Sequence, residues 1–287
     1  MKNDMIHLLV SFDQNYIKPF QTMIKSLSVS NPNEVFHICL FHSSISQEQM
    51  QELEAYCGAH RMILSPILID RTFFEDAPVS RQYPQEMYYR LVAPLLLPPT
   101  LDRILYLDPD ILVINPVRPL WELSLGENIF AAASHSSVFE IMNDVNRARL
   151  GKEHDYFNTG VLLIDLEKAR AVVTADDVFG YVREQADKLL LPDQDVFNVL
   201  YGHRTLQIDD AIFNYDVRYF SAYLLKSDSQ HTMNWVMRNT VFLHFCGRHK
   251  PWKNMCLSRF SALYQHYMNL AQKAETNKPH TVGYEKG

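Results

Sequence analysis

The segment Arg103–Val113 reads RILYLDPDILV, and the interpretation of the whole chain starts from it. A short apolar run with aromatic and β-branched members is typical of a buried strand. This run leads into two aspartates, Asp108 and Asp110, and a second apolar run follows them. Because Pro109 cannot donate a ladder hydrogen bond, we expect strand pairing to stop there and to leave both acids at the rim of a sheet.

Two carboxylates at a strand end are costly to bury unless they are paired or hold a cation. Residues i and i+2 of an extended segment point the same way, so Asp108 and Asp110 are placed to reach one ion together. The pattern therefore predicts a divalent-metal site. The alternative is a charged turn between two strands.

Length and composition limit the classes of protein to consider. A chain of 287 residues suits one large domain with a substantial core. With 47% hydrophobic and 21% charged residues, the composition is that of an ordinary soluble protein. A net charge of -6 provides no basic footprint for nucleic acid, so we expect no nucleic-acid partner. The four cysteines form no C-x-x-C pair, which favours a reduced, cytoplasmic chain.

Neither end of the chain suggests insertion into a membrane. The apolar run before Asp13 is too short for the core of a signal peptide. Nothing approaches the roughly 20 apolar residues of a membrane span. We expect no transmembrane segment. Peripheral contact with the inner face of a membrane stays an open alternative, and the sequence does not determine the oligomeric state.

Apolar runs alternate with amphipathic stretches, which favours βαβ units and a mostly parallel central sheet flanked by helices. Ser46 and Gln49 form a near capping box at one helix start. Gly160 is expected to allow a close backbone approach. The predicted strands span residues 5–12, 35–41, 62–69, 103–113, 129–133, 156–165 and 240–245, and the predicted helices 17–30, 87–95, 175–188, 193–200 and about 258–273, before a tail at 274–287 that is expected to fray.

Polar residues follow several predicted strands, at the ends where ligands of open α/β sheets bind. Asp13 and Asn15 follow the first strand, and His244 ends the last one. Two carboxylates and an imidazole suit Mn²⁺ or Mg²⁺, although a lone histidine is also a common hydrogen-bonded core residue. The segment from Gly247 to Lys250 combines a flexible turn, backbone amides and two cations, which predicts a diphosphate pocket; a solvated surface loop is the alternative.

Five motifs then occur in order: LYLDPD, YYRL at 88–91, FNTG at 157–160, DQD at 193–195 and HFCGRHKPW at 244–252. Together they resemble glycosyltransferase family 8, the retaining sugar-nucleotide transferases that include bacterial lipopolysaccharide galactosyltransferases and glycogenin. The resemblance spans about residues 6–252. It implies a single GT-A (Rossmann-like) domain over residues 1–255, followed by a small C-terminal helical elaboration and tail at 256–287.

The resemblance also implies roles for particular residues. By position, these are metal ligands at Asp108, Asp110 and His244; nucleotide and diphosphate contacts at Asp13, Asn15, Gly247 and Lys250; donor-sugar contacts at Arg90, Asn158, Gly160 and Asp193; and catalytic roles for Asp193 and Gln194. Without the resemblance, a helical Arg90 is more simply an arginine that faces solvent or pairs with an acid. Asp193 has an alternative reading as the N-cap of the helix that follows it.

The implied activity is metal-dependent transfer of glucose or galactose from a UDP-sugar to a saccharide acceptor, in synthesis of cell-surface polysaccharide or lipopolysaccharide. Retention permits a front-side substitution or a double displacement. Because an amide is a poor nucleophile, we favour the front-side route, with Gln194 stabilising the sugar cation. Ala133, Ser134 and His135 lie where many members carry an acid near the acceptor, so the acceptor stays undetermined.

Three other functions are alternatives to the transfer of a sugar to a separate acceptor: a phosphatase, a binding module and a self-glycosylating protein. A haloacid-dehalogenase-type phosphatase also uses a strand followed by Asp-x-Asp, but there the motif ends the first strand and a Thr or Val stands where this chain has Leu112. A catalytically silent nucleotide-sugar-binding module would bind UDP without turnover. A glycogenin-like protein would glycosylate itself.

Overall fold

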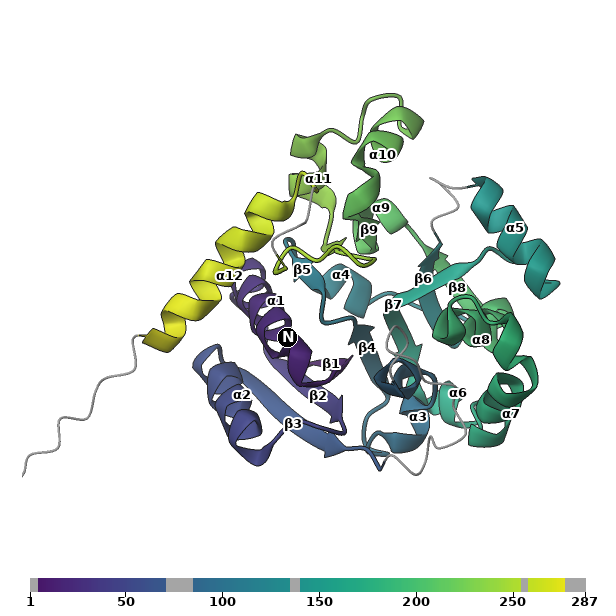
Figure 1. Cartoon of the computed structure of the whole chain (residues 1–287), viewed down its shortest axis with the longest axis horizontal. Coiled ribbons are helices and arrows are strands. Elements are labelled where there is room, and N and C mark those ends of the chain that lie inside the picture. The colour runs from purple at the N-terminus through teal and green to yellow at the C-terminus, as the bar shows by residue number, and fades with distance from the viewer. Residues whose placement is uncertain (1–4, 71–84, 135–139, 254–257, 277–287) are drawn as a thin grey trace, which may run out of the picture.

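The computed structural model describes residues 5–70, 85–134, 140–253 and 258–276. A seven-stranded sheet in the order β3-β2-β1-β4-β7-β6-β8 runs through its centre (Figure 1). Strands pair in parallel except at β7, which runs antiparallel to β4 and to β6. The predicted mostly parallel sheet is therefore confirmed. Its strands are β1 (Ile6–Ser11), β2 (Phe36–His42), β3 (Met62–Leu68), β4 (Arg103–Leu107), β6 (Phe130–Ser134), β7 (Phe157–Asp165) and β8 (Thr205–Ile208).

Helices cover both faces of this sheet, because alternate residues of its central strands are apolar on both sides. Leu8 of β1 and Leu105 of β4 belong to the core beneath α1 (Ile17–Ser30) and α2 (Gln47–Ala59). Leu9 and Tyr106, their neighbours in sequence, belong to the opposite core. The helices of that second face are α3 (Ala93–Leu96), α6 (Leu166–Arg170), α7 (Ala175–Gln185) and α8 (Pro192–Tyr201).

Local sequence signals explain where some helices begin. The predicted capping box of α2 is present: Ser46 Oγ accepts from the Gln49 amide at 3.2 Å, and Gln49 Oε1 accepts from the Ser46 amide at 3.1 Å. The helix predicted at 87–95 is wrong. Residues Gln85–Leu91 form a 3-10 helix, η3, and α3 starts afresh with Pro94 in its first turn, where the missing N–H of proline costs nothing.

A second, three-stranded sheet was not predicted. It contains β5 (Ile111–Val113), β10 (Phe242–His244) and β9 (Tyr215–Asp216) in the order β5-β10-β9. The late strand predicted at 240–245 is confirmed as β10, but it lies here and not in the central sheet. Antiparallel pairing sets His244 opposite Ile111, which immediately follows Asp110. This pairing carries the end of β10 to the acidic turn.

Helices from the C-terminal half surround this small sheet. They are α9 (Asp210–Phe213), α10 (Phe220–Lys226), α11 (Met233–Asn239) and α12 (Ser261–Thr276). Helix α12 lies along α1 (Figure 1). None of the helices in the described ranges is long and apolar enough to cross a membrane.

The remaining elements were also not predicted, except η5, which lies at the end of the helix predicted at 175–188, and two predictions lie outside the described residues. The elements are α4 (Arg118–Trp121), α5 (Glu140–Leu150), η1 (Gln14–Tyr16), η5 (Ala186–Lys188), η6 (Gly202–Arg204) and η7 (Val217–Tyr219). His135 and all but the first three residues of the predicted tail at 274–287 fall in the undescribed part. Cys39, Cys57 and Cys246 are free thiols.

Candidate functional site

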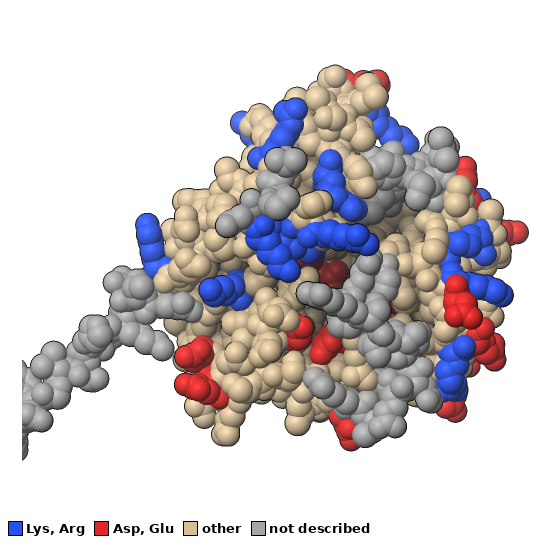
Figure 2. Space-filling view, in the orientation of Figure 1, with Lys and Arg blue, Asp and Glu red and all other residues tan. Residues whose placement is uncertain are grey.

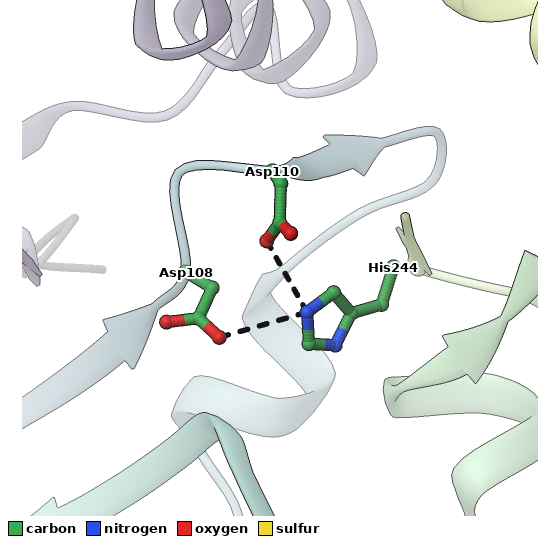
Figure 3. A group of neighbouring side chains, drawn as sticks. All are labelled: Asp108, Asp110 and His244. Carbon is green, nitrogen blue, oxygen red and sulfur yellow. Dashed lines mark ion pairs between the residues drawn. The ribbon is translucent and has the colours of Figure 1, made fainter. Parts of the chain in front are cut away.

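Two aspartates and a histidine meet where β4 ends. Asp108 follows β4 directly, Asp110 precedes β5, and His244 closes β10. His244 Nε2 lies 3.2 Å from Asp110 Oδ1 and 3.6 Å from Asp108 Oδ2 (Figure 3). One ligand atom from each residue falls within 4.8 Å of the others. The structure thus brings together the three residues expected to bind a metal.

The chemistry of this cluster fits a divalent cation. Asp110 Oδ1 is buried and, within the described residues, accepts no hydrogen bond of good geometry. Its neighbour His244 Nε2 lies 3.2 Å away but is poorly directed for a hydrogen bond, and an ion between the two groups would satisfy both. Carboxylate oxygens and one imidazole nitrogen are a ligand set for Mn²⁺ or Mg²⁺. Burial raises the pKa of the nearby Cys246 thiol, and His244 beside it opposes this shift.

Lys250 lies against the same acids. Its ammonium donates to Asp110 Oδ2 and, at 2.8 Å, to the carbonyl of Phe245. Burial raises the pKa of Asp110, but the Lys250 ammonium and His244 outweigh burial and hold that pKa well below its usual range. Gly247, in the same loop, has φ +83°, and a Cβ there would lie 2.9 Å from Arg218 Nη1. The loop expected to hold a diphosphate therefore adjoins the acid pair and needs glycine at 247.

Arg90 links the metal-type cluster to the start of α8. Its Nη2 lies 2.9 Å from Asp108 Oδ1, and its Nη1 lies 3.4 Å from Asp193 Oδ2. The side chain is only 9% exposed and sits over the ring of Tyr106, so Arg90 does not face solvent. The other alternative, pairing with an acid, is present. Tyr106 donates its hydroxyl to Asp108 Oδ1 at 2.7 Å. Asp108 is consequently held from two sides.

Asp193 is not the N-cap of α8, contrary to one alternative. The N-cap is Leu191, which makes no side-chain cap bond, and Asp193 lies in the first turn with its side chain buried. Thr159 Oγ1 donates to Asp193 Oδ2 at 2.8 Å. Burial raises the pKa of Asp193, and the opposing effect of Arg90 is smaller.

Asp195, the third residue of the DQD motif, anchors this part of the chain. It is fully buried, and Arg149 of α5 approaches both of its oxygens, at 2.6 and 2.9 Å. The hydroxyl of Tyr156 donates at 2.7 Å and the Leu190 amide at 2.8 Å. The carboxylate therefore ties α5 and the preceding loop to the first turn of α8.

The FNTG segment runs between these groups. Asn158 Nδ2 donates a long hydrogen bond to Gln194 Oε1, at 3.4 Å, so the two side-chain amides are in contact. A Cβ on Gly160 would overlap His244 Cε1 and lie 2.8 Å from Asp108 Oδ2. The predicted close approach is thus present, and what approaches Gly160 is the pair His244 and Asp108.

A cavity of about 180 Å³ joins the end of β1 to the acidic turn. Its lining includes Asp13 but not Asn15, which is exposed; both oxygens of Asp13 accept from Asn15, each at 2.9 Å. Figure 2 shows Lys and Arg side chains gathered above a hollow in which acidic side chains are visible. The residues that line the cavity are Ser11, Phe12, Asp13, Tyr16, Glu86, Met87, Arg90, Asp108, Pro109 and Asp110.

A second cavity, of about 410 Å³, lies beyond α9. Ser134 lines it together with Asp209, Lys226 and His231; Ser134 belongs to the segment 133–135, where the resemblance places an acid near the acceptor. It contains none of the residues predicted for the donor. Asp13 and Arg90, two of the residues expected to contact the donor, line the smaller cavity.

Sequence reasoning missed several residues of the site. The sequence pattern indicates only a strand-core role for Tyr106, gives Thr159 no role beyond its place in the FNTG motif, and does not single out Asn214. Strand alternation carries a weak signal for Tyr106, because its neighbours Leu105 and Leu107 face the other core. Asn214 gives no signal, since its partners lie 30 and 56 positions away.

Comparison with known proteins adds an independent result. The profile of the family described as "Glycosyl transferase family 8" matches residues 7–256. General stress protein A of Bacillus subtilis (strain 168) is 25% identical over 277 residues, covering 93% of this chain and 94% of that protein. Lipopolysaccharide 1,3-galactosyltransferase of Salmonella typhimurium is 25% identical over 253 residues, covering 87% and 73%. The crystal structure of galactosyltransferase LgtC with donor and acceptor sugar analogs has a TM-score of 0.78 at 23% identity, covering 92% and 96%, which shows a shared GT-A fold.

Proposed function

Because the chain belongs to glycosyltransferase family 8, we propose that it moves a hexose, glucose or galactose, from a UDP-sugar to a saccharide acceptor with retention of configuration. The observation that carries this proposal is the meeting of Asp108, Asp110 and His244 beside Lys250 at the carboxyl end of β4. Ligands of open α/β sheets bind at such ends. The uracil and ribose are assigned to the cavity next to Asp13.

The charges of the site argue for a cation that accompanies the donor. Three carboxylates, Asp108, Asp110 and Asp193, face two fixed cations, Arg90 and Lys250. Once His244 has lost its proton to act as a ligand, this group carries an excess of one negative charge, which repels a diphosphate. A bound Mn²⁺ or Mg²⁺ reverses the sign of that excess and attracts the donor.

Each residue then has a defined task in the transfer. A bound divalent cation supplies Lewis-acid stabilisation of the departing UDP, worth several kcal/mol. Lys250 holds a diphosphate oxygen in place of Asp110, and its charge stabilises the leaving group. Arg90 and Thr159 hold the carboxylate of Asp193 for the sugar hydroxyls. Gln194 directs its carbonyl dipole at the cationic sugar in a front-side substitution.

The alternatives have less support. The acids follow β4 and not the first strand, which disfavours the phosphatase. A catalytically silent module and a self-glycosylating protein would have the same fold as the proposed transferase. Only an activity measurement distinguishes the three.

A donor panel tests the proposal. Purified protein is incubated with UDP-glucose, UDP-galactose or UDP-N-acetylglucosamine, with Mn²⁺ or with EDTA, and released UDP is measured. We expect slow Mn²⁺-dependent hydrolysis of one of the first two donors, and its loss in Asp110→Asn. The matched control is Asp102→Asn, at an exposed acid before β4. If the protein binds UDP but releases no UDP from any of the three donors, the silent binding module is the better description. Release of phosphate from p-nitrophenyl phosphate would favour the phosphatase. An unchanged intact mass excludes self-glycosylation.

A further inference from the structure

A buried amide lies behind the metal-type cluster. Asn214 follows α9, is fully buried, and stands between His244 and Asn158. Its Oδ1 lies 2.8 Å from His244 Nδ1, and its Nδ2 lies 2.9 Å from Asn158 Oδ1. The contact with Asn214 uses Nδ1 of His244, and Nε2 is the nitrogen that lies near the aspartates.

A backbone amide fixes the orientation of this chain of hydrogen bonds. The Gly160 N–H lies 2.9 Å from Asn158 Oδ1, and because a backbone N–H only donates, this atom of Asn158 must be the oxygen. The group of Asn214 that faces the same oxygen must then be its NH₂. Its carbonyl oxygen therefore faces His244, and the imidazole nitrogen there, Nδ1, must carry a proton.

The protonation of Nδ1 decides what the other nitrogen does. A neutral imidazole with a proton on Nδ1 has its lone pair on Nε2. Nε2 is the atom that lies 3.2 Å from Asp110 Oδ1 and 3.6 Å from Asp108 Oδ2. The lone pair thus points at the place where the two carboxylates converge.

We propose that Asn214 is a positioning residue: it holds His244 in the tautomer that binds a divalent cation through Nε2, and it connects this ligand through Asn158 to Gln194. The second link rests on the 3.4 Å contact between Asn158 Nδ2 and Gln194 Oε1. Hydrogen-bonding partners behind a metal-ligating histidine set its ring orientation and basicity, and their loss typically lowers metal affinity about 10- to 100-fold. The inference rests on the proposed function, because the cation is the one proposed to accompany the donor.

Two substitutions at position 214 separate positioning from packing. Asn214→Leu has similar volume and no acceptor, so His244 loses the group that selects its tautomer. Asn214→Asp keeps an acceptor for the Nδ1 proton, loses the donor to Asn158 and adds a negative charge that the imidazole N–H faces. We expect the affinity for Mn²⁺ alone to fall about 10- to 100-fold in the leucine variant and to stay close to that of the unsubstituted chain in the aspartate variant.

A matched control accounts for loss of a buried amide in general. Asn31 is 5% exposed and bonds the Leu27 carbonyl and the Val117 amide, away from the cluster. Asn31→Leu should lower the melting temperature without changing the affinity for Mn²⁺. If Asn214→Leu and Asn214→Asp lose the same affinity for Mn²⁺, Asn214 acts only through packing, and the proposal is overturned.

The decisive measurement combines calorimetry and NMR on the full chain. Mn²⁺ is titrated calorimetrically into EDTA-treated protein, and the imidazole nitrogens of His244 are observed by ¹⁵N NMR with the diamagnetic ion Cd²⁺. We expect a protonated Nδ1 and a metal-bound Nε2 in the unsubstituted chain. Cd²⁺ on Nδ1, or leucine-variant affinity equal to that of the unsubstituted chain, overturns the inference. The NMR result decides even if the leucine variant does not fold. If the tautomer is as expected but no UDP-sugar is hydrolysed, the proposed function fails and the inference stands.

Discussion

The ammonium group of Lys250 donates a hydrogen bond to Asp110 Oδ2, so the residue proposed to hold the diphosphate is bound to a residue proposed to hold the metal. In the free protein this ion pair neutralises part of the acid cluster. Donor binding has to separate the two side chains. A cation that binds Asp110 frees Lys250 for the diphosphate, and a diphosphate that binds Lys250 frees Asp110 for the cation. Metal and nucleotide are therefore expected to bind cooperatively.

Lys250→Ala tests this coupling. Binding of UDP should weaken while binding of uridine stays nearly unchanged, because only UDP carries the diphosphate. Mn²⁺ alone should bind more tightly, since Asp110 no longer has an ammonium partner. Calorimetric titrations with each ligand measure both effects. Lys253→Ala, at an exposed lysine of the same segment, is the control, and equal weakening of UDP and uridine would remove the diphosphate role.

Gly160→Ala tests the close approach of the FNTG segment. The new Cβ would overlap the imidazole of His244 and lie 2.8 Å from Asp108 Oδ2, so the ligands must move. We expect the affinity for Mn²⁺ to fall by at least about tenfold, the size of effect seen when the support of a metal ligand is disturbed. Gly180→Ala in α7 is the control, because nothing lies within 4 Å of its added Cβ, and it should gain up to about 1 kcal/mol of stability. Unchanged affinity in Gly160→Ala would contradict the assigned geometry.

Arg90→Met removes the cation between Asp108 and Asp193. The buried Asp193 and the half-buried Asp108 then lose their partner, which costs about 3 kcal/mol of unfolding free energy, or several degrees of melting temperature. Mn²⁺ should restore part of the loss, because it neutralises Asp108. Thermal denaturation with and without Mn²⁺ measures this, with the exposed Arg204→Met as control. A melting temperature equal to that of the unsubstituted chain would show that Arg90 does not bridge the two acids.

Metal binding should depend on pH through His244. Burial lowers the pKa of His244, but Cys246 and Asp110 beside it raise it, and the net pKa lies well above 6.5. A proton therefore competes with the cation, so Mn²⁺ affinity should rise as pH increases from 6.5 through this raised pKa.

The stability of the metal-free protein should change in the opposite direction. A histidine whose pKa is raised on folding contributes stability that is complete below 6.5 and is lost as pH rises through the folded pKa. Melting temperatures of EDTA-treated protein at several pH values measure this contribution. Mn²⁺ affinity that does not vary with pH would show that His244 is not a ligand.

Local patterns predicted much of the fold and the acidic half of the site. The alternation of apolar and amphipathic segments indicates the central sheet, and the run RILYLDPDILV places the acids at a strand end. The pairing of β10 with β5 was not predictable, because it joins residues about 130 positions apart and no local pattern specifies it. That pairing is what delivers His244 to the aspartates.

Other differences have equally specific causes. The helix predicted around Arg90 fails because Pro94 begins a new helix, and the 3-10 turns before it direct the arginine inward. Asp195 belongs to the DQD motif, but only the tertiary contact with Arg149 accounts for its burial. Asn214 has no sequence signal because its role depends entirely on side chains from β7 and β10.

The central claim is that Asp108, Asp110 and His244 hold the cation that binds the donor's diphosphate. Anomalous diffraction at the manganese edge, from crystals grown with Mn²⁺ and UDP, tests it most directly. The account predicts one peak in contact with an oxygen of each aspartate, Nε2 of His244 and the diphosphate. Bound UDP without a peak at this position, or a peak held by other residues, would contradict it.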